Sequence, residues 1–268
     1  MPLLQLILVA LIQGITEFLP VSSSGHLILL PGLTGYTDQG QVIDVAVHVG
    51  TLAAVVIYFW RDVRMGLSGL TCLACGRANT EGARLALGLV VATIPTVLFG
   101  AFLHFTGFSD ALRSTAVIGW TMLIFGLVLY VADQKGAEEK VSADWGLRDA
   151  LIMGLWQMIA LIPGTSRSGI TITGARQLGY KREDGARIAM LMSIPTIIAS
   201  GVLLGTEVAL EADMALLRDA GIAALLAMLS ALAALSLMMR LLRSISFTPY
   251  VIYRVILGLI LLGFAYGS

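Results

Sequence analysis

The stretch Gln13-Gly-Ile-Thr-Glu-Phe-Leu-Pro-Val-Ser-Ser-Ser-Gly-His26 interrupts an apolar run over residues 3–30. Its proline, serines and glycine break a helix near the middle of a run that is otherwise long enough to cross a bilayer. Residues 163–169, Pro-Gly-Thr-Ser-Arg-Ser-Gly, break the apolar run 149–175 in the same way. Backbone groups freed by such a break are tolerated at membrane depth only inside protein or beside a wet cavity. Both runs are therefore expected to form re-entrant helical hairpins.

Six further apolar runs separate clusters of charged residues, and each is close to the roughly 20 residues that a spanning helix needs. They are 42–60, 84–104, 115–132, 186–205, 217–239 and 250–267. The composition agrees, because 57% of the 268 residues are hydrophobic, only 13% are charged, and the mean hydropathy is +0.89. A soluble domain carries about 25% charged residues. The sequence predicts an all-α integral membrane protein with six transmembrane helices and two re-entrant helical hairpins.

The charges predict the orientation of the chain. The formal net charge is zero, which argues against nucleic acid as a partner. Of the 17 basic residues, 13 lie in the segments 61–84, 133–148, 176–187 and 240–249. If each hairpin returns to its own side, these segments share one face, and the positive-inside rule makes that face cytoplasmic. Both termini and the loop 206–216 are then expected outside.

The two halves of the chain, 1–132 and 145–268, repeat each other at a constant offset of 144 residues. Each half has a hairpin followed by three spans, and the two hairpins would enter from opposite sides. This predicts an inverted-topology repeat within one membrane domain, an architecture of transporters whose sites lie near the membrane midplane. The matching pairs are Gln13 and Gln157, Ile15 and Ile159, Ser22 and Ser166, Ser24 and Ser168, and Gly25 and Gly169.

Three ionisable residues at the breaks are the first functional candidates, because charges inside apolar segments are costly. Glu17 and His26 flank the first break, and Arg167 lies in the second. A new helix is expected to begin after each break, and a helix N-terminus attracts phosphate through free N–H groups and its dipole. Arg167 can hold a phosphate through two parallel hydrogen bonds. If the breaks meet, the sequence predicts a phosphate-binding site between them.

Glu17 needs a counter-charge beside such an anion. Gln13 lies one turn earlier on the same helical face. Glu17 and Gln13 are therefore expected to bind a divalent cation, Mg²⁺ or Ca²⁺, together with the phosphates. Elsewhere, Asp44 and His48 predict a hydrogen-bonded pair at the cavity rim. Arg254 is expected to extend its side chain from the last span to the membrane surface.

Residues 13–26 and 163–171 resemble the two signature motifs of the bacterial undecaprenyl-pyrophosphate phosphatases, the BacA/UppP family. The chain length, the spans and the motif order also fit, so the resemblance covers essentially the whole chain. It implies hydrolysis of a polyprenyl pyrophosphate lipid, undecaprenyl pyrophosphate, to undecaprenyl phosphate and inorganic phosphate, with bacitracin resistance as a consequence. It also implies a multi-pass protein of the bacterial plasma membrane, surrounded by membrane lipid, whose site opens to the periplasmic or extracellular side.

By this resemblance the candidate catalytic residues are Glu17, Ser23, His26 and Arg167, with the nucleophile open between Ser23, His26 and a water. The candidate substrate-binding residues lie in the two turns: Ser22, Ser24, Gly25, Ser166, Ser168, Gly169 and Thr171. The alternative is a transporter or flippase of a polyprenyl phosphate lipid, but a pure carrier does not need Glu17 with His26 beside a serine. Glycines along the spans favour close helix packing or a homodimer.

Overall fold

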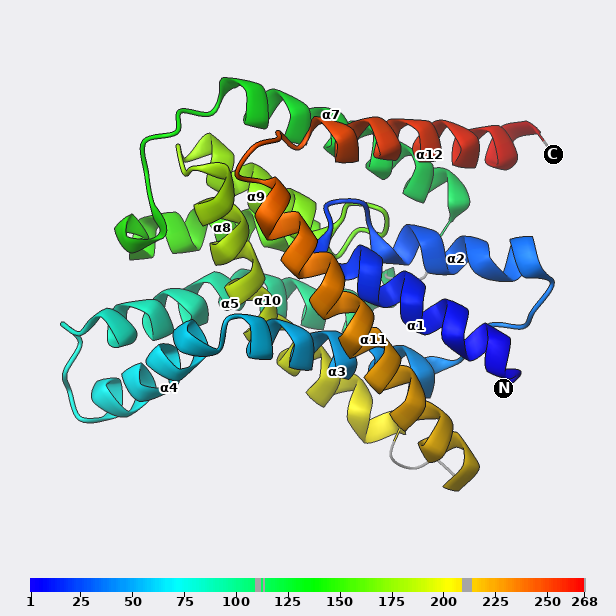
Figure 1. Cartoon of the computed structure of the whole chain (residues 1–268), viewed down its shortest axis with the longest axis horizontal. Coiled ribbons are helices and arrows are strands. Elements are labelled where there is room, and N and C mark those ends of the chain that lie inside the picture. Colours follow the sequence, from blue (N-terminus) through cyan, green and yellow to red (C-terminus); the bar gives the residue numbers. More distant parts are fainter. Residues whose placement is uncertain (109–111, 113, 209–213, 268) are drawn as a thin grey trace.

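The computed structural model describes residues 1–108, 112, 114–208 and 214–267, and these residues contain helices but no β-strand (Figure 1). The first half contains α1 (Leu3–Phe18), α2 (Ser23–Thr34), α3 (Gln41–Tyr58), α4 (Trp60–Ala74), α5 (Glu81–Thr106) and α7 (Thr115–Lys135). The second half contains the short 3₁₀-helix η1 (Ser142–Asp144), α8 (Leu147–Ile159), α9 (Arg167–Gln177), α10 (Arg182–Val208), α11 (Met214–Leu241) and α12 (Thr248–Gly267).

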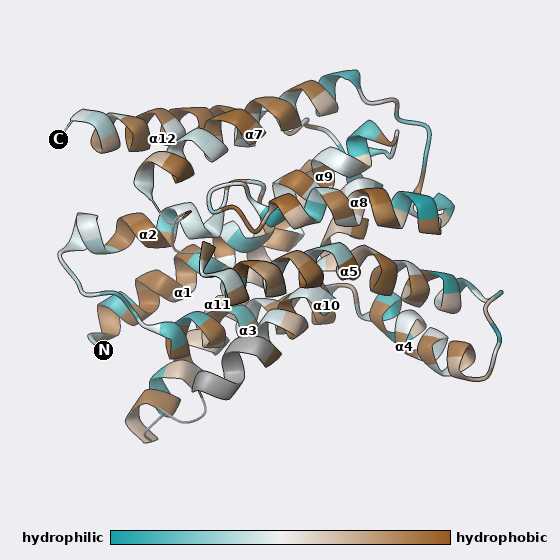
Figure 2. Ribbon diagram, turned by 180° about the vertical axis from the view of Figure 1, so that it is seen from behind, coloured by the Kyte–Doolittle hydropathy of each residue, from teal (hydrophilic) through white to brown (hydrophobic). Residues whose placement is uncertain are grey.

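Six helices are long and apolar enough to cross a membrane, namely α3, α5, α7, α10, α11 and α12. They correspond to the six predicted runs, so that prediction is confirmed, and the chain is a multi-pass membrane protein. Hydrophobic residues predominate along these helices (Figure 2), and large apolar side chains such as Leu98 and Ile252 are exposed. The helix α4 was not predicted, because its apolar residues alternate with charged ones.

Both helix breaks occur where the sequence predicts them. Ser22 and Ser166 precede the first residues of α2 and α9, and their φ angles are +71° and +69°. They are the two non-glycine residues with positive φ in the described parts of the chain, a backbone conformation that costs an L-residue about 1–3 kcal/mol. The two halves thus use the same strained turn. Entry of the hairpins into the membrane and the inverted topology remain predictions.

The first helix of each hairpin packs closely against a spanning helix from the other half of the chain: α1 packs against α11, and α8 packs against α5. A Cβ atom on Gly14 of α1 would lie 1.9 Å from Ser230 Oγ, and one on Gly154 of α8 would lie 2.5 Å from Ala92 O. Small residues let these backbones approach. Because these glycines pack within the chain, they give no support to the homodimer, which remains a prediction.

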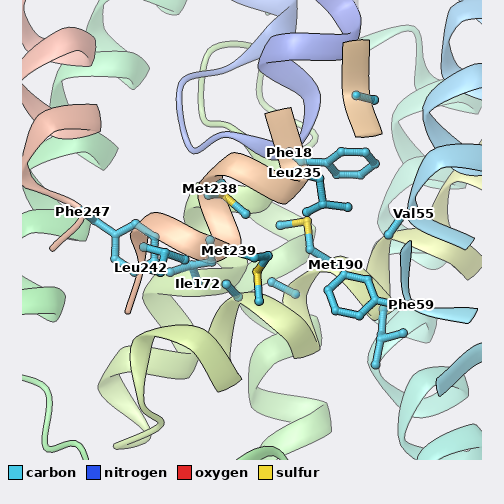
Figure 3. Packing of buried hydrophobic residues seen from close by; sticks show 14 of the residues in the cluster. Phe18, Val55, Phe59, Ile172, Met190, Leu235, Met238, Met239, Leu242 and Phe247 are labelled. Atoms are coloured by element: carbon cyan, nitrogen blue, oxygen red, sulfur yellow. The ribbon is translucent and has the colours of Figure 1, made fainter. Parts of the chain in front are cut away.

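The largest hydrophobic cluster anchors the end of α1 just before the first turn (Figure 3). Phe18 packs there with residues from α3, α9, α10 and α11 and with Phe247, which precedes α12. Because Phe18 is fully buried in this cluster, its neighbour Glu17 is held in place relative to the surrounding helices.

The four basic segments meet at one end of the molecule, whereas the N and C termini lie at the other end (Figure 1). Ion pairs join the basic segments to each other: Arg187 with Asp62, Arg182 with Asp133, and Arg243 with Glu183. Lys140 of the second segment pairs with Asp149 in the first turn of α8. This gathering agrees with the predicted common face of these segments. In the expected outer loop, residues 209–213 lie outside the described residues.

Candidate active site

The two turns meet, as the sequence predicts. Arg167 Nη2 donates to Glu17 Oε1 at 2.6 Å, which joins α9 to α1. Ser168 Oγ donates to the main-chain oxygen of Leu19 at 2.9 Å, and the Gly164 N–H donates to Ser24 Oγ at 3.4 Å. The N-termini of α2 and α9 are therefore brought together with one carboxylate and one guanidinium between them.

The Glu17 carboxylate is the centre of this arrangement and is only 8% exposed. Its Oε2 accepts hydrogen bonds from Gln13 Nε2 at 2.8 Å and from Ser23 Oγ at 2.9 Å. His48 Nε2, from α3, lies 3.9 Å from the same oxygen. The carboxylate thus contacts side chains from α1, α2, α3 and α9, and Ser23 is the hydroxyl whose proton it can accept.

A cavity of about 750 Å³ opens beside Glu17. Six of the predicted residues line it: Glu17, Ser22, Ser23, Ser24, Ser166 and Arg167. Other parts of its wall are aliphatic, from Val45, Val49 and Leu52 of α3 and Ile197 and Ile198 of α10. An ionic floor with an apolar wall suits the charged headgroup of a lipid whose chain remains in an apolar environment.

Six other predicted residues are not among the residues that line the cavity. Gln13 is fully buried, and the Thr171 hydroxyl donates to the main-chain oxygen of Arg167 within the first turn of α9. Gly25 and Gly169 provide close approach to Met122 and Arg254. Ser168 joins the two turns through Leu19, and His26 contacts Tyr253.

The His26 ring packs against Tyr253 of α12, with ring centroids 5.5 Å apart and planes within 2°. Nδ1 lies 2.7 Å from the main-chain oxygen of Ser22, and Nε2 lies 2.5 Å from the Tyr253 hydroxyl. A carbonyl oxygen can only accept, so Nδ1 carries the proton in the neutral ring. The Tyr253 hydroxyl then donates a hydrogen bond to Nε2. The sequence offered no sign of Tyr253, which lies 227 residues from His26.

Arg254 does not extend to the membrane surface, so that prediction is wrong. Its side chain is fully buried and donates to four main-chain oxygens, those of Thr121, Met122, Gly164 and Thr165, at 2.8–3.4 Å. Two of these oxygens belong to the second turn and two to α7. The guanidinium therefore fastens the turn that carries Arg167 to a spanning helix. Its planar fork can reach several carbonyls at once, which explains why it is bound internally.

Asp44 and His48 line the cavity, in agreement with their predicted place at its rim. Asp38, which the sequence did not single out, lines it from the segment before α3. Asp44 accepts a hydrogen bond from Gln39, and the His48 ring contacts the main-chain oxygen of Asp44. Gln157 bonds to the hydroxyls of Thr96 and Thr196, at the position that corresponds to Gln13 in the repeat. The contacts of Gln157 join α8 to α5 and α10, so no local sequence pattern predicts them.

The donor set near Glu17 has the oxygen chemistry that a hard divalent cation prefers. Gln13 Oε1 is buried without a hydrogen-bond partner in the described structure, one turn from the Glu17 carboxylate. The described residues contain no group of three or more His, Cys, Asp or Glu side chains that suits a metal. Magnesium sites often need only one or two carboxylates because substrate phosphates supply further ligands. The residues present therefore fit a cation held jointly with a phosphate ligand.

Residues 6–260 of the chain match the protein family described as Bacitracin resistance protein BacA. The chain belongs to the BacA family. Among curated proteins similar to it, one from Ruegeria sp. (strain TM1040) is 80% identical over 267 residues, which cover 100% of both chains. One from Jannaschia sp. (strain CCS1) is 68% identical with the same coverage. One from Teredinibacter turnerae is 47% identical over 97% of this chain and 98% of the relative. Each of these BacA relatives is named Undecaprenyl-diphosphatase.

Proposed function

We propose that this chain is an undecaprenyl-diphosphatase that hydrolyses undecaprenyl pyrophosphate to undecaprenyl phosphate and inorganic phosphate. The observation that carries the proposal is the contact of Ser23 and Arg167 with the Glu17 carboxylate at the edge of one cavity. Phosphoryl transfer requires neutralisation of phosphate charge, an oriented nucleophile and a proton acceptor. The names of the relatives supply the substrate.

The geometry favours Ser23 over His26 as the nucleophile. Ser23 Oγ lines the cavity and donates to Glu17 Oε2 at 2.9 Å. In the proposed first step this oxygen attacks the terminal phosphorus, its proton passes to Glu17, and the bridging P–O bond breaks to release the lipid monophosphate. A water then attacks the phosphoserine and the P–Oγ bond breaks. Glu17 returns its proton to Ser23 Oγ, and inorganic phosphate leaves with the atoms of the water. His26 is a weaker candidate because its unprotonated nitrogen, Nε2, already accepts a hydrogen bond from the Tyr253 hydroxyl.

Arg167 is proposed to stabilise the charge that develops on the transferring phosphate. One arm of its guanidinium, Nη2, pairs with Glu17, while Nη1 has no partner among the described residues. A second arm directed at the phosphate would use the bidentate geometry that distinguishes arginine from lysine. The N-terminal N–H groups of α2 and α9 add positive potential at the same place.

A divalent cation, Mg²⁺ or Ca²⁺, is proposed as the cofactor. Glu17 and Gln13 would hold it, and it would neutralise part of the negative charge of the pyrophosphate. The support for this is the buried Gln13 Oε1, which has no partner among the described residues and belongs to the amide whose nitrogen donates to Glu17. Dependence of activity on added cation, with loss of activity after chelation, is the direct check.

The membrane of residence is proposed to be the bacterial plasma membrane, with the cavity open to the outer side. The cavity wall includes Asp38 and Gln41 near the start of α3, whereas the basic segments gather beyond the other end of that helix. Labelling of introduced cysteines with an impermeant reagent tests this in a background without Cys72 and Cys75. Thr37→Cys should react in intact cells and Glu139→Cys should not. The opposite result would reverse the orientation.

The experiment that tests the function is release of inorganic phosphate from a prenyl pyrophosphate by the purified full-length protein in detergent. Ser23→Ala should lose nearly all turnover but keep substrate binding. Ser114→Ala, which removes a capping hydroxyl of α7 outside the cavity, is the matched control. A wild-type protein that moves a polyprenyl phosphate across vesicles but releases no phosphate would instead identify a carrier.

A further inference from the structure

The cavity beside Glu17 has an apolar strip that takes no part in the steps proposed above. Five aliphatic residues from α3 and α10 form it: Val45, Val49, Leu52, Ile197 and Ile198. The three residues of α3 are spaced by four and three positions, so they lie on one face of that helix. At 1.5 Å per residue, this part of the strip is about 10 Å long. The two helices pack against each other, which brings both parts of the strip to one cavity.

Two residues of the apolar strip are half exposed although they belong to spanning helices. The exposed fraction is 50% for Val49 and 49% for Ile198. Val49 lies eight residues after Gln41, the first residue of α3, and so about 12 Å along a helix of about 27 Å. A helix that crosses the roughly 30 Å hydrocarbon core has this residue at membrane depth. Aliphatic surface in contact with water is unfavourable in proportion to its area, so the strip favours an apolar ligand.

A polar strip runs along the neighbouring face of α3. Gln41, Asp44 and His48 line the cavity and are spaced by three and four positions. The polar strip is the one next to the reacting groups, because His48 Nε2 lies 3.9 Å from Glu17 Oε2. One helix therefore presents both a polar and an apolar surface to the same cavity. This arrangement suits a ligand whose charged group lies at Glu17 and whose apolar part begins directly beside it.

We propose that the apolar strip binds the first part of the prenyl chain while the pyrophosphate lies at Glu17 and Arg167. This inference rests on the proposed function and adds to it the place of the chain. Val49 and Ile198 contact the chain, and their exposed aliphatic surface is covered when it binds. The protein thereby distinguishes a long prenyl pyrophosphate from a short one by the apolar area that is buried on the strip.

The test measures kcat/KM of the purified full-length protein in detergent for farnesyl pyrophosphate, which has a long chain, and for dimethylallyl pyrophosphate, which has a short one. Val49→Thr keeps the shape of the side chain, and Val90→Thr, at an exposed position of α5 that does not line the cavity, is its matched control. We expect the long-to-short ratio of kcat/KM to fall about fourfold in Val49→Thr, because a methyl group that contacts the chain is replaced by a hydroxyl. The ratio should stay at the wild-type value in Val90→Thr. Ile198→Trp should lower it about tenfold because the added bulk occupies the place of the chain, whereas Ile252→Trp on α12 should not.

Photocrosslinking of the wild type separates this inference from the proposed function, because it requires neither turnover nor a variant that folds. A farnesyl pyrophosphate analogue with a photoreactive group on its chain is bound, and the labelled peptides are identified by mass spectrometry. Labelling within Gln41–Tyr58 or Arg182–Val202 that excess unlabelled substrate reduces supports the inference. If such labelling occurs but no phosphate is released, only the proposed function fails. Labelling confined to other helices, labelling that excess substrate does not reduce, or equal ratios in Val49→Thr and Val90→Thr would overturn the inference.

Discussion

Replacement of Arg254 by methionine should unfold the second turn. The guanidinium donates to the main-chain oxygens of Gly164 and Thr165 at 3.2 and 2.8 Å. It also donates to Thr121 and Met122, but these lie within α7, where carbonyls also accept helical hydrogen bonds. Methionine fills similar space and donates nothing, so the two buried turn oxygens lose this donor.

The expected cost follows from those two oxygens. A buried acceptor left without a donor costs about 1–3 kcal/mol, so Arg254→Met should lower the free energy of unfolding by about 2–6 kcal/mol. Arg254→Lys keeps the charge but cannot span both α7 and the turn, so it should lie between methionine and the wild type. Because the turn carries Arg167, phosphate release should fall in both variants.

Denaturant unfolding in detergent, followed by circular dichroism, measures this cost. The matched control is Arg240→Met at the exposed end of α11, which should change the free energy of unfolding by no more than about 0.5 kcal/mol. If Arg254→Met were as stable as this control, the buried guanidinium would not be what holds the turn. If Arg254→Lys matched the wild type, a point charge would be sufficient and the fork geometry irrelevant.

Three further changes probe the other contacts. Gln13→Glu replaces the donor 2.8 Å from Glu17 by a second carboxylate, so activity should become more dependent on Mg²⁺ or Ca²⁺ in a cation titration. Glu17→Gln should abolish cation-dependent phosphate release. An unchanged cation requirement in Glu17→Gln would place the ion elsewhere. Arg167→Lys should lose about 2–4 kcal/mol of transition-state stabilisation, measured from kcat/KM, and near-normal turnover would make Arg167 structural. Tyr253→Phe keeps the aromatic ring but removes the hydroxyl that donates to Nε2 of His26, so ¹⁵N spectroscopy should show a larger population of the Nε2-protonated tautomer. Tyr266→Phe on the same helix should leave that population unchanged.

The sequence was sufficient for the spans and the breaks because both depend on local composition. An apolar run predicts a spanning helix wherever it is, and the run 84–104 lies within α5 (Glu81–Thr106). Proline, serine and glycine together predict an interruption for equally local reasons. The helix α4 was missed because its mixed polarity does not resemble a span.

The wall of the cavity could be predicted only in part, because its contacts join distant helices. Arg254 was misplaced because an arginine near the end of a span usually reaches the surface, and its actual acceptors are main-chain oxygens, which have no side-chain signature. The contact of Tyr253 with His26 depends on how α12 is rotated against the first hairpin. No spacing along the chain encodes that rotation.

The separation of Glu17 from its counter-charge has a consequence for how the protein is made. Arg167 is 150 residues further along the chain, so at ribosomal rates of about 5–20 residues per second it emerges roughly 8–30 s later. Throughout that interval the nascent first half carries a carboxylate in an apolar hairpin without its arginine. The first hairpin can reach its final place only after the second has been synthesised. The amino-terminal half expressed alone should therefore insert poorly, and co-expression of the other half as a separate chain should rescue it.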